Sequence, residues 1–364
     1  MQISIFTSLK TDAAAAAAEV CAKVGSPKLL ILLSSFDLFE KISNIVSEKF
    51  PNTPIIGTGT ISYCGKDSSD KRTILLAFGN DIDVEVGVIR KLSTAPMLDI
   101  PAMEEKISKI SAGDSNTVCL EFCTNDEERL VTSLNVALER SRIPIVGGTV
   151  FGYPQGYVPK VLVNGQLYKD ACCYALVKNK AGKIRTYSEN IYGPMACPKI
   201  HIATKVNLAT KELISLDGRP AADVYCQDAD VSRSQLVDNV LTNPLGRVIG
   251  DQIFVSSPYG IGNNGSLIVY KRINENDSIQ VLELKDYDAI QYDTRQSIKH
   301  ENGKISFILS VNCIYRHLLF SNKGYLNEFI GNMGSLGPHV GVVGGGEQYK
   351  KQHVNQTMVC AVFE

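Results

Sequence analysis

The apolar run TVCLEFC (117–123), in the first half of the chain, begins the stretch that says most about the fold. A polar loop through Asn125 and Asp126 follows, then a helical segment to about Arg142, and then the short strand PIVGG (144–148). Strand, helix and strand in this order form a βαβ unit, whose crossover is right-handed and whose two strands are parallel. This stretch therefore predicts a parallel strand pair covered by a helix.

Two further stretches repeat the same order of elements. The first copy has an apolar run at 28–33, a helix at 38–50 and a strand at 54–57, and the last has an apolar run at 305–313, a helical segment to about 337 and HVGVVGGGE at 339–347. Ligands bind α/β sheets outside the carboxyl ends of the strands. We therefore expect the function at three glycine loops, which contain Gly57, Gly147 with Gly148, and residues 344–346.

The composition is that of an ordinary globular protein. With 364 residues, of which 44% are hydrophobic and 21% charged, the chain can form one large or two moderate domains. A formal net charge of -1 and the lack of a Lys/Arg block argue against nucleic acid as a partner. No run approaches the roughly 20 apolar residues that span a bilayer, so we expect no membrane insertion and a cytoplasmic location.

The pattern of elements places a boundary near residue 180. The first two units are each followed by an apolar strand, at 73–78 and 171–177, and a polar turn at 179–183 precedes the second half. The third unit and a last strand at 357–363 close the chain. We predict a mixed α+β protein of the α/β type, with repeated βαβ units in two related halves, 1–180 and 181–364, packed around mixed sheets.

The metal-binding and redox patterns are weak. Ten cysteines are scattered without a Cys-x-x-Cys pair, which favours reduced core thiols over disulfides or zinc. The five histidines form no His-Glu-x-x-His motif. The run Gly-Gly-Gly-Glu lacks the Gly-Lys-Ser/Thr ending of a phosphate-binding loop. We therefore assign no metal site and no nucleotide site.

Two features of the last unit have the chemistry of a small-ligand site. Backbone N–H groups of Gly345 and Gly346 could bind a carboxylate or a polar edge, with Glu347 as an acceptor. Arg316, just after the apolar run, could bind a carboxylate through two hydrogen bonds. Two alternatives remain open at this point: a simple glycine turn with a solvated Glu347, and an internal ion pair of Arg316, for example with Glu347.

The order of several short motifs resembles the FIST sensory domain, with its N-terminal and C-terminal halves. The motifs are LDGRPA (216–221), PLG (244–246), Asn312-Cys313 with Arg316, GGE (345–347) and His353-x-Asn355-Gln356-Thr357. The resemblance implies a sensor that binds a small ligand, such as an amino acid or another small carboxylate. It also implies a stand-alone sensor acting in trans on a signalling partner such as a histidine kinase, a chemotaxis transducer or a cyclic-dinucleotide enzyme.

The first loop departs from the family pattern. Where the family has Gly-Cys-Ser-Thr-Ala-Gly-Glu, this chain has GTGTISY (57–63) and therefore no glutamate. The departure shifts the expected ligand contacts to the last unit. The candidate ligand residues are Arg316, Gly345, Gly346, Glu347, His353 and Gln356, with Gly57, Gly147 and Gly148 as other walls.

Two alternative functions follow from the same residues. Some members of the family resemble haem-binding nitric-oxide sensors that regulate a histidine kinase, and His317 and His353 are the candidate axial ligands here. A cysteine-dependent enzyme is the other alternative, with Cys313 as the thiolate, Arg316 beside it and His353 as the base. We rank both below the sensor, and we expect the chain not to be an enzyme.

Overall fold

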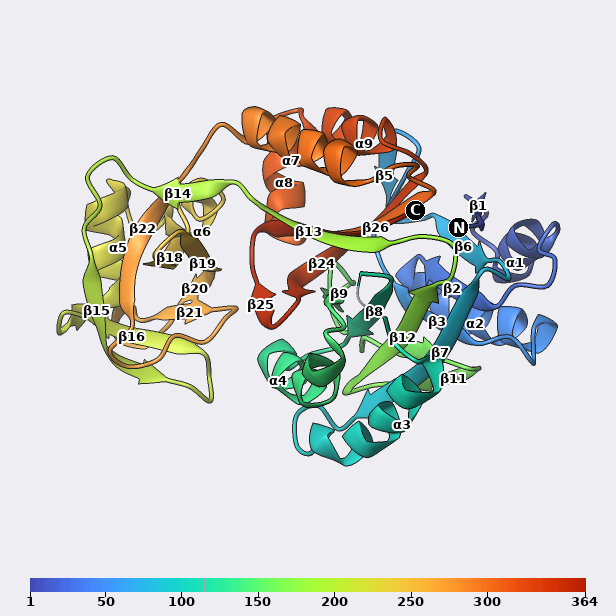
Figure 1. The fold of residues 1–364 in the computed structure, drawn as a ribbon. Helices are drawn as coiled ribbons and strands as arrows, with labels where there is room; N and C mark the ends of the chain where they lie inside the picture. The colour runs from blue at the N-terminus through green and yellow to red at the C-terminus, as the bar shows by residue number, and fades with distance from the viewer. Residues whose placement is uncertain (114) are drawn as a thin grey trace.

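The computed structural model describes residues 1–113 and 115–364, which form a layered body and a smaller inserted domain (Figure 1). The layered body contains two stacked sheets and both chain ends, and the amino group of Met1 donates a hydrogen bond to the Glu364 carbonyl at 2.7 Å. The inserted domain comprises residues 192–284. The mixed α+β class and the repeated βαβ units in two related halves are confirmed.

The central sheet of the layered body combines strands from both predicted halves. Its order is β13 (Ile184–Asn190), β26 (Thr357–Phe363), β23 (Phe307–Cys313), β24 (His339–Tyr349), β9 (Ile145–Val150), β8 (Thr117–Cys123), β12 (Ala171–Asn179) and β7 (Ile82–Arg90). The short strands β25 (Gln352–Val354) and β4 (Ser62–Cys64) also pair with β24, and β5 (Asp67–Ser69) pairs with β4.

The carboxyl ends of the parallel strands meet in the middle of this sheet. β8 and β9 form one parallel pair, β23 and β24 form the other, and β24 joins β9 in antiparallel fashion. The register places Cys313 beside Gly344, Gly344 beside Val150, and Thr149 beside Cys123. The ends of β23, β9 and β8 therefore lie in one row, which is the position where α/β sheets bind ligands.

A second sheet packs face to face on the central sheet. Its order is β1 (Ile3–Ser8), β6 (Thr73–Phe78), β2 (Leu29–Ser34), β3 (Ile55–Gly59), β10 (Val161–Val163) and β11 (Gln166–Tyr168). Side chains of β2, β6, β8 and β23 share one hydrophobic core between the two sheets. The apolar runs at 29–33 and 117–123 are buried on both faces, as the sequence predicts for strands with layers on either side.

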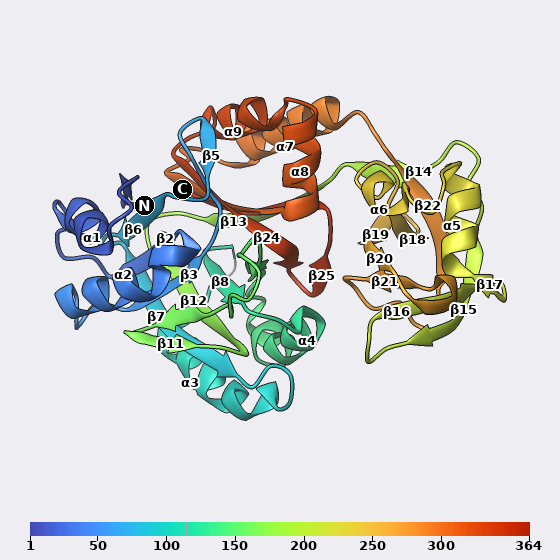
Figure 2. The same cartoon turned by 180° about the vertical axis from the view of Figure 1, so that it is seen from behind.

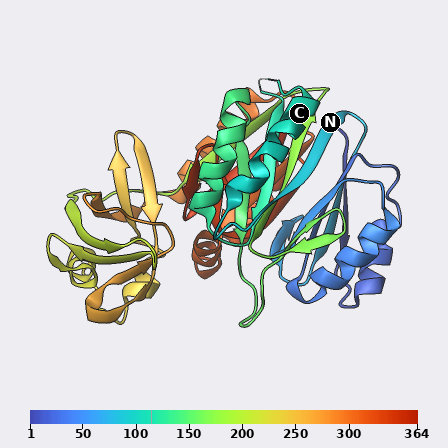
Figure 3. The same cartoon turned by 90° about the horizontal axis from the view of Figure 1, so that it is seen from below.

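Helices cover the two outer faces (Figures 2 and 3). α1 (Ala13–Cys21) and α2 (Phe36–Lys49) pack on the N-terminal sheet. α3 (Ile100–Ile110) and α4 (Glu127–Leu138) cover one half of the central sheet, and α7 (Tyr287–Glu301), α8 (Ile314–Asn322) and α9 (Leu326–Gly334) cover the other. Asp12 and Asp286 cap α1 and α7 by accepting backbone N–H bonds. No helix among the described residues is long and apolar enough to cross a bilayer.

The predicted glycine loops are wrong, because all three segments are strands. Gly57 lies in β3, Gly147 and Gly148 lie in β9, and Gly345 lies in β24. A Cβ atom at Gly147 would lie 2.1 Å from Glu121 Oε1, and one at Gly57 would lie 2.4 Å from the Leu32 carbonyl oxygen. Glycine is thus required here for close packing between strands.

The run of glycines in β24 contains a β-bulge. Gly344 pairs with Val150 and Glu347 pairs with Gly148, so three steps along β24 match two steps along β9. The extra residue interrupts the ladder at the row of strand ends.

The inserted domain has its own curled sheet and core, set to one side of the layered body (Figures 1 and 3). The strand order is β19 (Gln252–Ser256), β18 (Leu245–Ile249), β22 (Ser278–Leu284), β15 (His201–Asn207), β16 (Glu212–Leu216), β21 (Leu267–Val269) and β20 (Pro258–Ile261), with β14 (Tyr192–Pro194) on β22 and β17 (Arg219–Pro220) on β16. α5 (Ala221–Ala229) and α6 (Leu236–Asn239) belong to its core. The chain enters after β13 and leaves before α7.

Candidate functional site

A cleft of about 390 Å³ lies at the row of strand ends, between the layered body and the inserted domain. We call it the interdomain cleft. The layered body supplies residues after β8, residues at the end of β9 and the bulge of β24, and the inserted domain supplies the facing wall. The lining residues are Thr124, Asn125, Asp126, Glu127, Thr149, Val150, Phe151, Tyr153, Ala209, Thr210, Lys211, Tyr259, Tyr270, Arg272 and Gly345.

Aromatic rings form a continuous chain across the cleft. The ring of Tyr153 lies 6.2 Å from that of Phe151, which lies 6.0 Å from Tyr270 of the inserted domain. Tyr270 in turn packs on Tyr259 at 4.5 Å. Tyr259 is 42% exposed, so this end of the row of aromatic rings is accessible to a ligand. Because Phe151 belongs to the layered body and Tyr270 to the inserted domain, the shape of this apolar surface depends on the relative orientation of the two domains.

Charged groups of both signs lie beside the aromatic chain. Lys211 Nζ lies 3.3 Å from Glu127 Oε2, and Arg272 Nη2 lies 3.7 Å from Asp126 Oδ1. Arg272 also donates to Glu128 through its backbone N–H at 2.9 Å and through Nη1 at 2.7 Å. These ion pairs connect the first turn of α4 to the inserted domain. They also offer cations to a carboxylate and carboxylates to an ammonium group.

The environment keeps Glu127 ionised. Burial opposes the charged form, but the Lys211 ammonium and a hydrogen bond from the backbone N–H of Glu127 outweigh burial and lower the pKa of the Glu127 carboxyl. Asp126 has positive φ and forms no side-chain cap on α4. The 12-residue helix α4 begins at the cleft. The N–H groups of its first turn are not capped by the Asp126 side chain.

Of the predicted ligand residues, Gly345 lines the interdomain cleft, whereas Glu347 is not among the lining residues. Glu347 is fully buried, and Thr357 Oγ1 donates to its Oε2 at 2.6 Å. Burial raises the pKa of the Glu347 carboxyl to about 8, so the side chain is neutral at pH 7. A Cβ atom at Gly345 would lie 2.7 Å from the ring of Phe151, so this glycine lets the aromatic chain approach the sheet.

His353 and Gln356 connect the layered body to the inserted domain. The His353 carbonyl accepts from Lys271 Nζ at 2.7 Å. Gln356 Oε1 accepts from Ser257 Oγ at 2.8 Å, and its Nε2 donates to the Val240 carbonyl at 3.1 Å. Both residues are buried, and Gln356 has a φ of 53°. Their contacts link the layered body to the domain that forms the far wall of the cleft.

Arg316 does not pair with Glu347. It lies in the first turn of α8, fully buried, and its Nη2 donates to a carboxylate oxygen of Glu189. Its guanidinium carbon lies 4.8 Å from the ring centroid of Phe320 and 5.2 Å from that of Phe329. Of the two interpretations left open, an internal ion pair is therefore observed, with Glu189 as the partner.

The two candidate haem ligands lie in different surroundings. His353 is 3% exposed, and its two ring nitrogens lie 3.2 Å from Gln348 Nε2 and 3.4 Å from Asn355 Nδ2. Burial lowers the pKa of His353 to about 4. His317 Nδ1 lies 2.9 Å from the hydroxyl of Tyr63, and the two rings stack at 5.8 Å.

The described residues contain no metal-binding cluster, and the Cys313 thiol is not activated. Among the described residues, no three His, Cys, Asp or Glu side chains are arranged to hold a metal ion. Cys313 is buried at the start of α8, and burial, with Glu347 beside it, raises the pKa of its thiol well above the ordinary value. A thiol in this state is a poor nucleophile.

Sequence reasoning missed most of the lining residues. The polar loop through Asn125 and Asp126 after a buried strand was a usable signal for one wall. No nearby sequence motif identifies Tyr259, Tyr270 or Arg272 as lining residues, because they come from a separate domain more than 100 residues further along the chain.

Comparison with known protein families agrees with this architecture. The FIST N domain matches residues 28–219, and the FIST C domain matches residues 221–350. A search of curated proteins found no match. The two adjoining matches divide the chain within the inserted domain, just before α5. The chain belongs to the FIST family, whose domains serve sensory signal transduction.

Proposed function

We propose that this protein senses an amino acid or a related small carboxylate in the interdomain cleft and signals to a partner protein in trans. The observation that carries the proposal is the cleft itself, at the row of strand ends, with aromatic rings and ion pairs contributed by two domains. Its volume of about 390 Å³ is within the range of small-molecule sites, roughly 300–1,000 Å³.

The polar groups suit a ligand that carries both charges. Arg272 and Lys211 are cations that a ligand carboxylate would attract, and Asp126 and Glu127 would attract an ammonium group. The Tyr259–Tyr270 pair offers an apolar face for a side chain. An α-amino acid satisfies all three requirements, whereas a dicarboxylate would meet repulsion from Asp126.

The signal follows from the position of the cleft. A ligand that bridges the two walls binds the closed arrangement of the domains more tightly, so it shifts the population toward that arrangement. Residues before β14 and after β22 carry both connections and are the natural hinges. A histidine kinase, chemotaxis transducer or cyclic-dinucleotide enzyme of the same cytoplasm would detect the change.

A thermal-shift screen tests the proposal. The protein is heated with each amino acid and with matched hydroxy acids and dicarboxylates, and a ligand at 100 times its Kd should add about 2.7 kcal/mol. Tyr259→Ala should abolish the shift, because Tyr259 is the exposed ring of the cleft. Tyr292→Ala, on α7 and 54% exposed, is the matched control and should leave it unchanged.

Two outcomes would count against this site. Equal loss of the shift in both tyrosine variants would place the ligand elsewhere, and no shift from any compound would remove the small-ligand sensor. An absorbance spectrum recorded after haem loading tests the alternative cofactor, since a Soret band lost only on substitution of His317 or His353 would favour a haem sensor.

A further inference from the structure

The strand β7 forms one open edge of the central sheet. Within the described part of the chain it pairs on one side only, with β12. The Lys180 N–H donates to the Asp81 carbonyl, which makes these two residues a hydrogen-bonded pair of the antiparallel ladder. Every second residue from Asp81 therefore faces β12, and the backbone groups of Ile82, Val84, Val86, Val88 and Arg90 point outward.

The second half of this edge is already capped. Lys106 of α3 donates to the Val86 carbonyl at 2.5 Å, and the Arg90 N–H donates to Asp99 Oδ2 at 2.7 Å. These contacts confirm the outward direction derived from the ladder. Proteins protect sheet edges in this way against other strands. The outward groups of Ile82 and Val84 have no such partner among the described residues.

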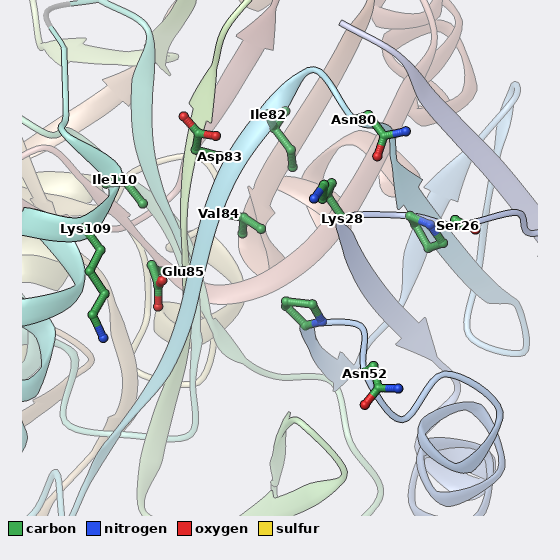
Figure 4. A pocket seen from close by; sticks show the side chains of 12 residues that line it. Ser26, Lys28, Asn52, Asn80, Ile82, Asp83, Val84, Glu85, Lys109 and Ile110 are labelled. Carbon is green, nitrogen blue, oxygen red and sulfur yellow. The ribbon is translucent and has the colours of Figure 1, made fainter.

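A groove of about 580 Å³ runs along this uncapped part (Figure 4). One wall is the start of β2 and β3, with Pro27, Lys28 and Pro54. The other wall is formed by Glu85 of β7 and Lys109 of α3. The uncapped edge of the strand lies between these two walls, and the groove has room for a single extended segment.

We propose that this groove binds an extended peptide segment of a partner protein, which adds as a short strand to β7 at Ile82 and Val84. Main-chain hydrogen bonds to the outward N–H and C=O groups would supply affinity, as in other cases of strand addition. Side chains of an added strand alternate between the two walls. The preferred segment carries apolar residues toward Pro27 and Pro54 and charged residues toward Glu85 and Lys109.

A peptide-display selection on the full chain tests this inference. Random heptapeptides on phage are the probe, and the selected sequences should alternate apolar and charged residues. Val84→Pro should weaken the binding of a synthetic selected peptide about tenfold or more, because proline removes the outward N–H and blocks the edge. Val84→Ile keeps the N–H and a β-branched apolar side chain, and it should bind within about threefold of the original chain.

The proline variant should still fold, because the N–H that it removes does not pair with β12. Hydrogen exchange of the unsubstituted protein, resolved to single amides, gives a second measurement. Without peptide the Ile82 and Val84 amides should exchange fast while their neighbours Asp83 and Glu85 are protected, and peptide should slow the first two.

Three results would overturn the inference. One is a selection that yields no binder. Another is peptide binding that Val84→Pro leaves unchanged while the Ile82 and Val84 amides gain no protection. The third is a dimer, seen by light scattering without peptide, that Val84→Pro dissolves, since the edge would then serve a second copy of the chain.

Discussion

Replacing Arg316 by methionine tests whether this arginine stabilises the fold or binds a ligand. Arg316 and Glu189 are both fully buried, and no other cation pairs with Glu189 among the described residues. Methionine leaves the Glu189 carboxylate buried without its partner. Breaking a buried pair in this way costs about 3–5 kcal/mol, because the remaining charge is not compensated.

The size of the effect follows from the surroundings of the guanidinium. Arg316 packs against the rings of Phe320 and Phe329, so methionine keeps much of the apolar contact and loses mainly the charge. A second change, Glu189→Leu, removes the stranded carboxylate. The double variant should recover most of the stability, since an apolar pair of similar volume is often as stable as a buried ion pair.

Urea unfolding followed by circular dichroism is the suitable assay, because the chain has no tryptophan. If m is about 3 kcal/mol/M, the Arg316→Met midpoint should fall by about 1–1.7 M, and the double variant should lie close to the original protein. Arg316→Lys keeps the charge without the planar fork, so its midpoint should lie between these two.

The result that would refute this reasoning is a double variant no more stable than Arg316→Met. The ligand screen adds an independent criterion, because Arg316 lies outside the interdomain cleft. The double variant should keep the thermal shift that an amino acid produces. Loss of that shift in a stable double variant would return Arg316 to the binding site.

Three further predictions concern buried titratable groups and the contact between the domains. Between about pH 4.5 and pH 8 the neutral Glu347 should make stability fall with rising pH, by about 1.4 kcal/mol per pH unit, because the native state holds a proton that the unfolded chain has lost. Glu347→Gln should make pH-dependent melting less steep over this range, and the buried Glu121, whose pKa burial also raises to about 8, should account for part of the remaining slope. A thiol reagent should modify the exposed Cys197 quickly and the buried Cys313 only on unfolding, and fast loss of Cys313 in mass spectra would contradict its burial. A double-mutant cycle of Glu128→Gln and Arg272→Gln should give a coupling of about 1 kcal/mol in unfolding, and additive effects would show that this contact does not hold the domains together.

The glycines illustrate what a local pattern can and cannot predict. The run at 339–347 predicts a strand over 339–343 that leads into a glycine loop, and the structure confirms the strand but shows that it continues through the glycines. A bulge and a loop need the same flexible backbone, so composition does not separate them. The difference depends on the pairing of β24 with β9, which is a contact between residues almost 200 positions apart.

The sequence predicted where the candidate site lies, at the strand ends, but not which residues line it. Parallel strands and their helices direct attention to the strand ends, and both the loop at Asp126 and Gly345 do line the cleft. Arg316 has the right chemistry for a ligand, yet helix α8 turns it into the core, where Glu189 neutralises it. The direction of a side chain depends on what packs around its helix, and the order of residues does not reveal this.

The amino-acid sequence by itself determined the mixed α+β class, the βαβ units and the family, because hydrophobic period, turn residues and motif order are local properties. Only the tertiary structure decided that two parallel pairs join through β24 and β9, that a curled domain closes the cleft and that β7 keeps an open edge. These features come from contacts between distant segments, and such contacts are selected by the free energy of the whole packed chain.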